Sequence, residues 1–303
     1  MYKLTNKEKF EVIRIVLQSS DIIMSMVESS KDIKVLEQKG SANYVTKIDY
    51  DVQEYIEKHI LNLFPDHHFL GEEDDQHKFD KAKPCWILDP VDGTKNLILD
   101  VHHSSTSLAF WNGEELNFAI IYDPFSDELY EASRNEGSYL INNAKQQIIT
   151  VKEFQNLHKM KLTINNISDL KHAIVAFGSS PYDRGTELDY KVMFQVLYDI
   201  FKNTEDIRRY GSAALDLAYL AANRHHVFLE AKLRPWDFAA GILIVEESGG
   251  IVTNFHNQPV NIFKASSILS ANPTLHKLIL PLIEKHQKQL VANHSVVLSI
   301  AAG

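Results

Sequence analysis

Hydrophobic positions in the first 65 residues recur at helical spacing. Thr5 and Glu8 form the sequence signature of a helix-capping box, and apolar residues three and four apart follow it: Phe10, Ile13, Val16, Leu17, Met24 and Val27. A second such set comes after the polar stretch 39–43 and stops before Pro65: Ile48, Val52, Tyr55, Ile56 and Leu63. Because residues at this spacing share one face of a helix, the pattern predicts two amphipathic helices at the start of the chain.

From Phe69 to about residue 150 the pattern changes to short apolar runs separated by turn residues. Such runs are typical of β-strands, and they cover residues 69–70, 85–88, 107–111, 116–122, 128–132 and 138–141. Asn112-Gly113 lies between two of these runs and is typical of a two-residue hairpin turn. We therefore expect an antiparallel sheet in this half of the chain.

Beyond residue 150 the predicted strands alternate with helices. The strands cover residues 173–177, 206–209, 227–231, 251–253 and 267–270, and the helices cover 187–201, 213–222, 236–247 and 273–287. This alternation is typical of α/β architecture. Because no Pro- or Ser-rich linker separates the halves, strand-rich to about 150 and alternating over 151–288, we predict one domain over residues 1–288. Residues 289–303 show no clear pattern and are assigned no role.

Charge and cysteine content narrow the function classes. The 303 residues carry 31 Lys and Arg against 40 Asp and Glu, a net charge of −9 that should repel nucleic acid and anionic lipid. The single cysteine, Cys85, excludes an intrachain disulfide and a cysteine-based zinc site. Because the sequence also lacks a signal-peptide core and a membrane-length apolar run, we expect a cytoplasmic protein without nucleic-acid or membrane partners. An anionic substrate would then need bound cations or a cradle of N–H groups.

The segment 86–96 carries the most chemical information. An apolar run ends in Asp89, and a turn containing Pro and Gly presents Asp92 three residues later. If Thr94 begins a short helix, the free N–H groups of residues 93–95 face one point, as at an anion-binding helix N-terminus. Asp-Pro and Asp-Gly are also common in surface turns, so this segment alone does not decide the function.

Two other segments add carboxylates. Glu72 belongs to an acidic run, 71–75, after a predicted strand, and Asp237 lies at the start of a predicted apolar helix. Separately, they are typical of a solvated loop and of an acid near a helix N-terminus. Together with Asp89 and Asp92 they would put four carboxylates in one cleft, which repulsion makes unfavourable without cations. Oxygen ligands without His or Cys favour Mg²⁺ or Mn²⁺ over zinc.

Three motifs, taken in order, carry a family resemblance. They are Gly71-Glu72-Glu73, Asp89-Pro-Val-Asp92-Gly-Thr94 and Trp236-Asp237-x-Ala-x-Gly241. From the first helix to Gln287 the chain resembles the inositol monophosphatase family of magnesium-dependent phosphatases. The resemblance implies a layered α-β-α-β-α sandwich, phosphoric monoester hydrolase activity, two to three Mg²⁺ ions with Mn²⁺ as an alternative, and a homodimer.

The resemblance also implies a role for each matching residue. A first ion would be held by Glu72, Asp89 and the carbonyl of Val91, a second by Asp89, Asp92 and Asp237, and a third, weaker ion near Glu72. Asp49, matching a V-T-x-x-D motif, would act with Thr94 to orient and deprotonate the attacking water without a covalent phosphoenzyme. The implied phosphate and substrate contacts are Asp92, Gly93, Thr94, Gly211, Ser212, Ala213, Glu230 and Ser179.

Departures from the family pattern leave the substrate open. Lys95-Asn96-Leu97 stands where the family usually has T-N-F, Lys39 is the candidate for a lysine beside the metals, and the loop 180–184 also differs. We expect inositol monophosphate, with fructose-1,6-bisphosphate, NADP(H), histidinol phosphate and 3′-phosphoadenosine 5′-phosphate as alternatives. A non-catalytic interaction protein is a further alternative, against which the retained carboxylates argue.

Overall fold

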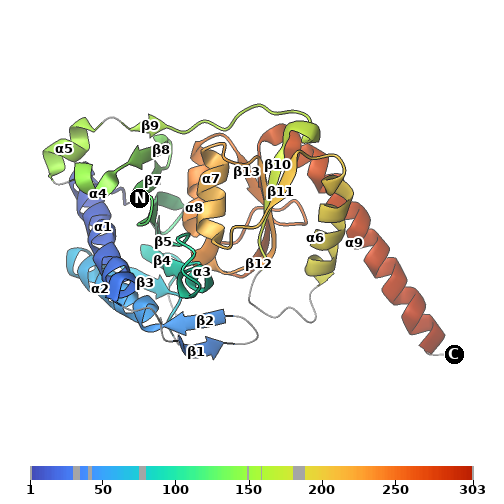
Figure 1. The fold of residues 1–303 in the computed structure, drawn as a ribbon, viewed down its shortest axis with the longest axis horizontal. Helices are drawn as coiled ribbons and strands as arrows, with labels where there is room; N and C mark the ends of the chain where they lie inside the picture. Colours follow the sequence, from blue (N-terminus) through green and yellow to red (C-terminus); the bar gives the residue numbers. More distant parts are fainter. Residues whose placement is uncertain are drawn as a thin grey trace.

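The computed structural model describes residues 2–29, 35–39, 43–74, 80–148, 150–157, 159–179 and 188–301. The described chain forms five layers in the order helices, sheet, helices, sheet, helices (Figure 1). The layered α-β-α-β-α architecture expected from the sequence is confirmed. Each layer has an apolar face that packs against the next layer and is buried there.

The first helical layer consists of α1 (Asn6–Ser29) and α2 (Lys47–Leu63). The predicted capping box begins α1, because Thr5 N donates to Glu8 Oε2 (2.7 Å) and Glu8 N donates to Thr5 Oγ1 (3.2 Å). The apolar faces of both helices pack on one face of the first sheet. Between the helices, β1 (Val35–Lys39) and β2 (Asn43–Thr46) pair antiparallel.

The first sheet has seven strands in sequence order. They are β3 (His68–Gly71), β4 (Cys85–Asp92), β5 (Ser105–Trp111), β6 (Leu116–Asp123), β7 (Glu128–Ser133), β8 (Gly137–Asn142) and β9 (Met160–Lys161). Only the β3–β4 pair is parallel among these neighbours, which confirms the expected antiparallel character.

The hairpin between β5 and β6 differs from the prediction in its loop. A two-residue turn at Asn112-Gly113 is wrong, because the loop covers residues 112–115. Asn112 Oδ1 accepts hydrogen bonds from Glu114 N and Glu115 N, both at 3.0 Å, and only Gly113 of the pair has positive φ, +102°. A side-chain acceptor at the first position favours this longer loop over a tight primed turn.

Strand β4 also runs further than its apolar residues suggested. Pairing with β5 shifts between Asp89 and Asp92, where Pro90 lacks the N–H that a regular ladder needs. The strand nevertheless continues to Asp92, and every residue in it is buried. Asp89 and Asp92 are therefore held in a buried strand and not in an exposed turn after it.

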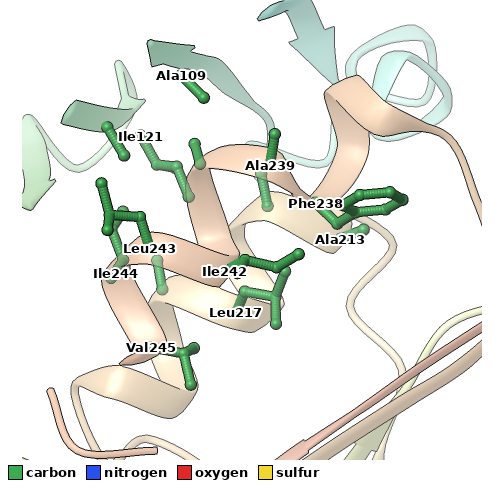
Figure 2. Packing of buried hydrophobic residues seen from close by; sticks show 14 of the residues in the cluster. Ala109, Ile121, Ala213, Leu217, Phe238, Ala239, Ile242, Leu243, Ile244 and Val245 are labelled. Atoms are coloured by element: carbon green, nitrogen blue, oxygen red, sulfur yellow. The ribbon is translucent and has the colours of Figure 1, made fainter. Parts of the chain in front are cut away.

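The middle layer is formed by α7 (Ala213–Ala221) and α8 (Pro235–Glu247), which lie between the two sheets. Figure 2 shows Ile242 of α8 beside Leu217 of α7, and Ile121 of β6 near Leu243 and Ile244. The two helices approach closely at Gly241, where an added Cβ would lie 2.4 Å from the Leu217 side chain.

The second sheet has the order β11-β10-β12-β14-β13. Its strands are β10 (Ile174–Phe177), β11 (Asp206–Arg208), β12 (Val227–Leu233), β13 (Ile251–Thr253) and β14 (Ser266–Ala271). The outer helices α6 (Leu188–Phe201) and α9 (Pro273–Ala301) cover its far face. Short helices complete the fold: α3 (Thr94–Ile98), α4 (Ala144–Gln147), α5 (Val151–Asn156) and a 3₁₀ turn, Leu170–His172.

The final helix is longer than its sequence pattern predicted. The expected end at Gln287 is wrong, since α9 continues through Ala301 and extends away from the layers (Figure 1). Its last part lacks the 3.6-residue apolar stripe that packing on a sheet requires, which is why the pattern did not predict it. Among the helices in the described ranges, none combines the length and the apolar character needed to cross a membrane.

Candidate metal and phosphate site

Three carboxylates from separate elements meet between the first sheet and α8. One oxygen each of Glu72, Asp89 and Asp237 lies within 4.8 Å of the others. Glu72 directly follows β3, Asp89 lies in β4, and Asp237 is in the first turn of α8. Glu72 and Asp89 are 17 positions apart in the sequence, and Asp89 and Asp237 are 148 apart. The structure thus brings together three of the four carboxylates that the sequence predicted to share one cleft.

Burial makes this cluster hard to ionise without a cation. Removal from water is the first cause that raises the pKa of Glu72, Asp89 and Asp237 above the ordinary range, and repulsion between neighbouring carboxylates adds to it. A divalent cation would reverse both effects by supplying charge and ligand bonds. Three carboxylates offer only hard oxygen donors, so the donor set fits Mg²⁺ or Mn²⁺.

Asp92 interacts electrostatically with the three clustered carboxylates and also accepts hydrogen bonds from the N-terminus of α7. Asp92 Oδ2 accepts hydrogen bonds from Ser212 Oγ (2.5 Å) and Ala214 N (2.7 Å). Burial raises its pKa to about 6, and these hydrogen bonds limit the rise. Its charge in turn contributes to the raised pKa of Glu72, Asp89 and Asp237, but Asp92 is not one of the three carboxylates that lie within 4.8 Å of one another.

Asp49 and Thr94 form a preassembled pair. Thr94 Oγ1 donates to Asp49 Oδ1 at 2.9 Å, and it also lies 3.0 Å from the carbonyl oxygen of Val91. Asp49 Oδ2 accepts from Thr46 N (2.8 Å) and Thr46 Oγ1 (2.5 Å), so Asp49 completes the capping box of α2. Burial raises the pKa of Asp49 to about 6. The V-T-x-x-D spacing therefore has a local structural cause, because its Thr is the N-cap and its Asp the third helical residue.

The turn before Thr94 is held by its neighbours. Gly93 has φ +94°, and a Cβ there would lie 3.0 Å from the carbonyl oxygen of His103. Asn96 Nδ2 donates to that carbonyl (2.8 Å) and to the carbonyl of Tyr210 (2.9 Å), which ties α3 to the segment before α7. Asn96 N closes the turn on the Gly93 carbonyl (2.8 Å), so the N–H groups of residues 93–95 precede the first helical hydrogen bond.

The expected substrate residues border the same region. Ser212 is the N-cap of α7, and Gly211 has φ +93°. Glu230 is buried in β12, and its charge raises the pKa of Asp237. A Cβ on Gly178 would lie 1.7 Å from Glu230 Oε2, so the glycine beside Ser179 leaves the space that this carboxylate occupies.

The inositol monophosphatase family model matches residues 6–288. The chain belongs to the inositol monophosphatase family. It is similar to Nus factor SuhB of Salmonella typhimurium strain LT2, 32% identical with 88% of this chain and 92% of that protein covered, and to inositol-1-monophosphatase of Bacillus subtilis, 31% identical with 84% and 89% covered.

Solved structures of the family agree with the fold. The IMPase of Thermotoga maritima is 25% identical with a TM-score of 0.77, covering 94% of this chain and 99% of that one. SaIMPase-II with inositol monophosphate bound is 25% identical with a TM-score of 0.72, covering 94% and 96%. The same SaIMPase-II has also been solved with 2′-AMP bound, at 26% identity and a TM-score of 0.73, covering 93% and 95%.

Three further sequence features stood beside the family motifs: Lys95, Lys39 and the loop 180–184. Lys95 is exposed. The Lys39 side chain and the loop 180–184 lie outside the described residues. Neither of these two predictions is tested.

The sequence reasoning missed the hydroxyl groups behind the family motif. Thr106 Oγ1 donates to the carbonyl of Pro90 (2.9 Å), Ser104 Oγ donates to that of Gly93 (3.0 Å), and Ser105 Oγ lies 3.5 Å from Ser212 Oγ. Four consecutive small hydroxyl residues, 104–107, precede or begin the run 107–111 that was predicted to be a strand. Since buried hydroxyls need partners, this run was a usable signal for a polar neighbour.

Proposed function

We propose that the protein hydrolyses a phosphate monoester of a small polyol in a Mg²⁺-dependent reaction, with inositol monophosphate as the first substrate to test. The observation that carries the proposal is the group of half-buried Glu72 with buried Asp89 and Asp237, together with the Asp49–Thr94 pair. The Bacillus subtilis relative named inositol-1-monophosphatase and the inositol monophosphate complex of SaIMPase-II support this substrate. Residues 1–288 would form the catalytic unit.

The metal-binding part of the proposal uses oxygen donors only. Glu72, Asp89, Asp92, Asp237 and the carbonyl of Val91 would hold two to three Mg²⁺ ions, with Mn²⁺ as a substitute. Bound divalent cations lower the pKa of water and neutralise phosphate and leaving-group charge. They also let a chain of net charge −9 accept an anionic substrate.

The remaining steps fall to the chain's own groups. Thr94 Oγ1 would take a proton from the attacking water as it passes its own proton to Asp49 Oδ1, so the threonine hydroxyl is restored and Asp49 ends protonated. Asp49 suits this task because burial raises its pKa to about 6, close to neutral pH. The N–H groups of residues 93–95 donate to phosphate oxygens. Gly211, Ser212, Ala213, Glu230 and Ser179 would contact the phosphate and the alcohol, and no covalent phosphoenzyme forms.

Phosphate release from a substrate panel tests the proposal. The panel holds inositol-1-phosphate, fructose-1,6-bisphosphate, NADP, histidinol phosphate, 3′-phosphoadenosine 5′-phosphate and 2′-AMP. Asp92→Asn removes a proposed ligand, and Asp66→Asn, at an exposed turn, is the matched control. Turnover that requires Mg²⁺, survives Asp66→Asn and is lost in Asp92→Asn supports the proposal. A folded, Mg²⁺-loaded protein that turns over none of the six compounds overturns it.

A Nus-factor role is a second candidate. Nus factors SuhB of Salmonella typhimurium and Escherichia coli are 32% and 34% identical to the chain. Replacing the chromosomal gene with the Asp92→Asn allele separates the two functions. A defect equal to that of a deletion favours hydrolysis, whereas full complementation by the inactive allele favours the Nus-factor role.

The proposed homodimer and cytoplasmic location follow from the family and from the sequence. Light scattering coupled to size-exclusion chromatography tests the dimer, for which a mass near twice 34.6 kDa is expected. The second candidate function, a Nus-factor role like that named for the SuhB relatives, would include nucleic-acid binding among the activities to test.

A further inference from the structure

A buried glutamine, Gln53, links the helix that carries Asp49 to the segment that carries Glu72. Gln53 lies on α2, one turn after Asp49, and only 5% of it is exposed. Its Oε1 accepts a hydrogen bond from Glu73 N (3.0 Å), and its Nε2 donates to Asp74 Oδ1 (2.9 Å). Asp74 Oδ2 accepts from Gly71 N at 2.9 Å, so these bonds close around Glu72 from both sides.

Close packing against Gln53 also holds the segment 71–74 in place. A Cβ on Gly71 would lie 2.4 Å from the Gln53 amide, so the amide packs directly on the backbone of the segment 71–74. This segment presents three acidic side chains in succession, Glu72, Glu73 and Asp74, which repel one another. A neutral amide can offer a donor to one and an acceptor to the backbone without adding charge.

We propose that Gln53 is a positioning residue that holds Glu72 in register with Asp49 and thereby sets the affinity of the site for divalent cations. The inference rests on the proposed function, since it assumes that Glu72 is a metal ligand. One helix carries both Asp49 and Gln53 on the same face, four residues apart. A shift of the segment 71–74 relative to α2 would therefore separate the ligand from the acid that accepts the Thr94 proton.

An exchange of donor and acceptor tests this role. Gln53→Glu keeps the side-chain length but turns the donor toward Asp74 into an acceptor. Adding Asp74→Asn restores a donor on the opposite side, so the double variant has the wild-type net charge and an inverted version of the same hydrogen bond. Gln195→Glu, on the exposed side of α6, is the control for charge alone.

Calorimetric titration with Mn²⁺, without substrate, is the readout. We expect Gln53→Glu to weaken Mn²⁺ binding about 10- to 100-fold, the double variant to recover most of that loss, and Gln195→Glu to bind as the wild type. Extra negative charge near a cation site would by itself tighten binding, so a loss identifies displacement of the ligand. Circular dichroism confirms that each variant is folded.

Two results would overturn the inference. One is Mn²⁺ affinity in Gln53→Glu equal to or above that of the wild type, and the other is a folded double variant as weak as the single one. Failure of the proposed function looks different, because the titration needs no turnover. A protein that binds Mn²⁺ as expected but hydrolyses none of the panel compounds contradicts the activity and leaves the role of Gln53 supported.

Discussion

At the scale of single residues, Thr94 is the group whose loss separates chemistry from folding. Thr94→Ala removes the donor to Asp49 Oδ1 and the hydroxyl proposed to hold the water. We expect kcat to fall about 10²- to 10⁴-fold, the usual contribution of a positioned proton-transfer group. Thr94→Ser keeps the hydroxyl and should retain most of the activity. Steady-state kinetics at saturating Mg²⁺ measures the effect, and an unchanged kcat in the alanine variant would refute the assigned role.

Gly93 provides a second residue-scale prediction, because its conformation and its surroundings both require glycine. Its φ of +94° costs other residues about 1–2 kcal/mol, and its Cβ would also lie 3.0 Å from the His103 carbonyl oxygen. Gly249 has φ +93° with nothing within 4 Å, so Gly249→Ala measures the conformational cost alone. Urea unfolding should show a larger loss of stability for Gly93→Ala. Equal losses would mean that the contact with His103 is easily relaxed.

The carboxylates of the site could be predicted from the sequence, whereas the amide side chains that hold them and their neighbours in place could not. Glu72, Asp89 and Asp237 could be singled out because carboxylates follow strands or begin a helix. Gln53 and Asn96 could not, since an amide has no preferred spacing and their partners are far along the chain. Gln53 bonds to Glu73 and Asp74 some twenty residues away, and Asn96 bonds to a carbonyl 114 residues away.

At the scale of elements, three helix N-termini point at the acidic cluster. Asp49 completes the capping box of α2, and Asp92 accepts a hydrogen bond from Ala214 N in the first turn of α7. Asp237 Oδ2 accepts from Arg234 N (2.6 Å) at the start of α8. Each positive helix end favours a carboxylate by about 0.3–1 kcal/mol at an exposed site and more where it is partly buried. The helices therefore offset part of the repulsion among these acids.

The contact between α7 and α8 gives the element-scale prediction. Gly241→Ala places a Cβ 2.4 Å from the Leu217 side chain, and overpacking of this kind costs about 1–3 kcal/mol. Leu217→Ala in the same background makes room, so the double variant should lose less stability than the sum of the single ones. Urea midpoints of the four proteins complete the cycle. Strict additivity would show that the helices separate without resistance.

Element types were predictable to the extent that apolar periodicity reports burial. The alternating strands and helices of the second half appear where expected, because each buries one face on a sheet. The hairpin β1–β2, on both sides of the polar stretch 39–43, was not predicted, because its four- and five-residue strands carry no clear alternation. The four-residue turn at Asn112 was missed because the side-chain acceptor, and not the Asn-Gly pair, decides its length.

At the scale of the whole molecule, the layered arrangement places acidic side chains that repel one another between the first sheet and α8. Asp49 and Asp92 have pKa values raised to about 6 from an ordinary 3.8, and the pKa values of Glu72, Asp89 and Asp237 are raised as well. The folded, metal-free protein therefore holds protons that the unfolded chain has released. By linkage, the contribution of Asp49 and Asp92 to the stability of the fold is complete below about pH 4 and is lost as pH rises through 6. The raised pKa values of Glu72, Asp89 and Asp237 act in the same direction.

Removing one of these acids should therefore stabilise the metal-free protein. Asp237→Asn keeps an oxygen to accept from Arg234 N but deletes a charge. In chelator, we expect this variant to be more stable than the wild type by an amount that grows from pH 5 to pH 8. Buried His225 and half-buried His103 have lowered pKa values and oppose this trend, but both proteins share them, so their effects cancel in the difference.

Magnesium should reverse the order of the two proteins. At 100 times its dissociation constant, a cation that binds only the folded state adds about 2.7 kcal/mol, and a variant lacking a ligand gains less. Thermal unfolding at pH 5 and pH 8, with chelator and with Mg²⁺, gives all the values needed. If the wild type is the more stable protein in chelator at pH 8, the carboxylates do not repel one another in the fold, and a cation is not what the cluster requires. If instead the order reverses on adding Mg²⁺, the acids that destabilise the empty site are the ones that hold the ion.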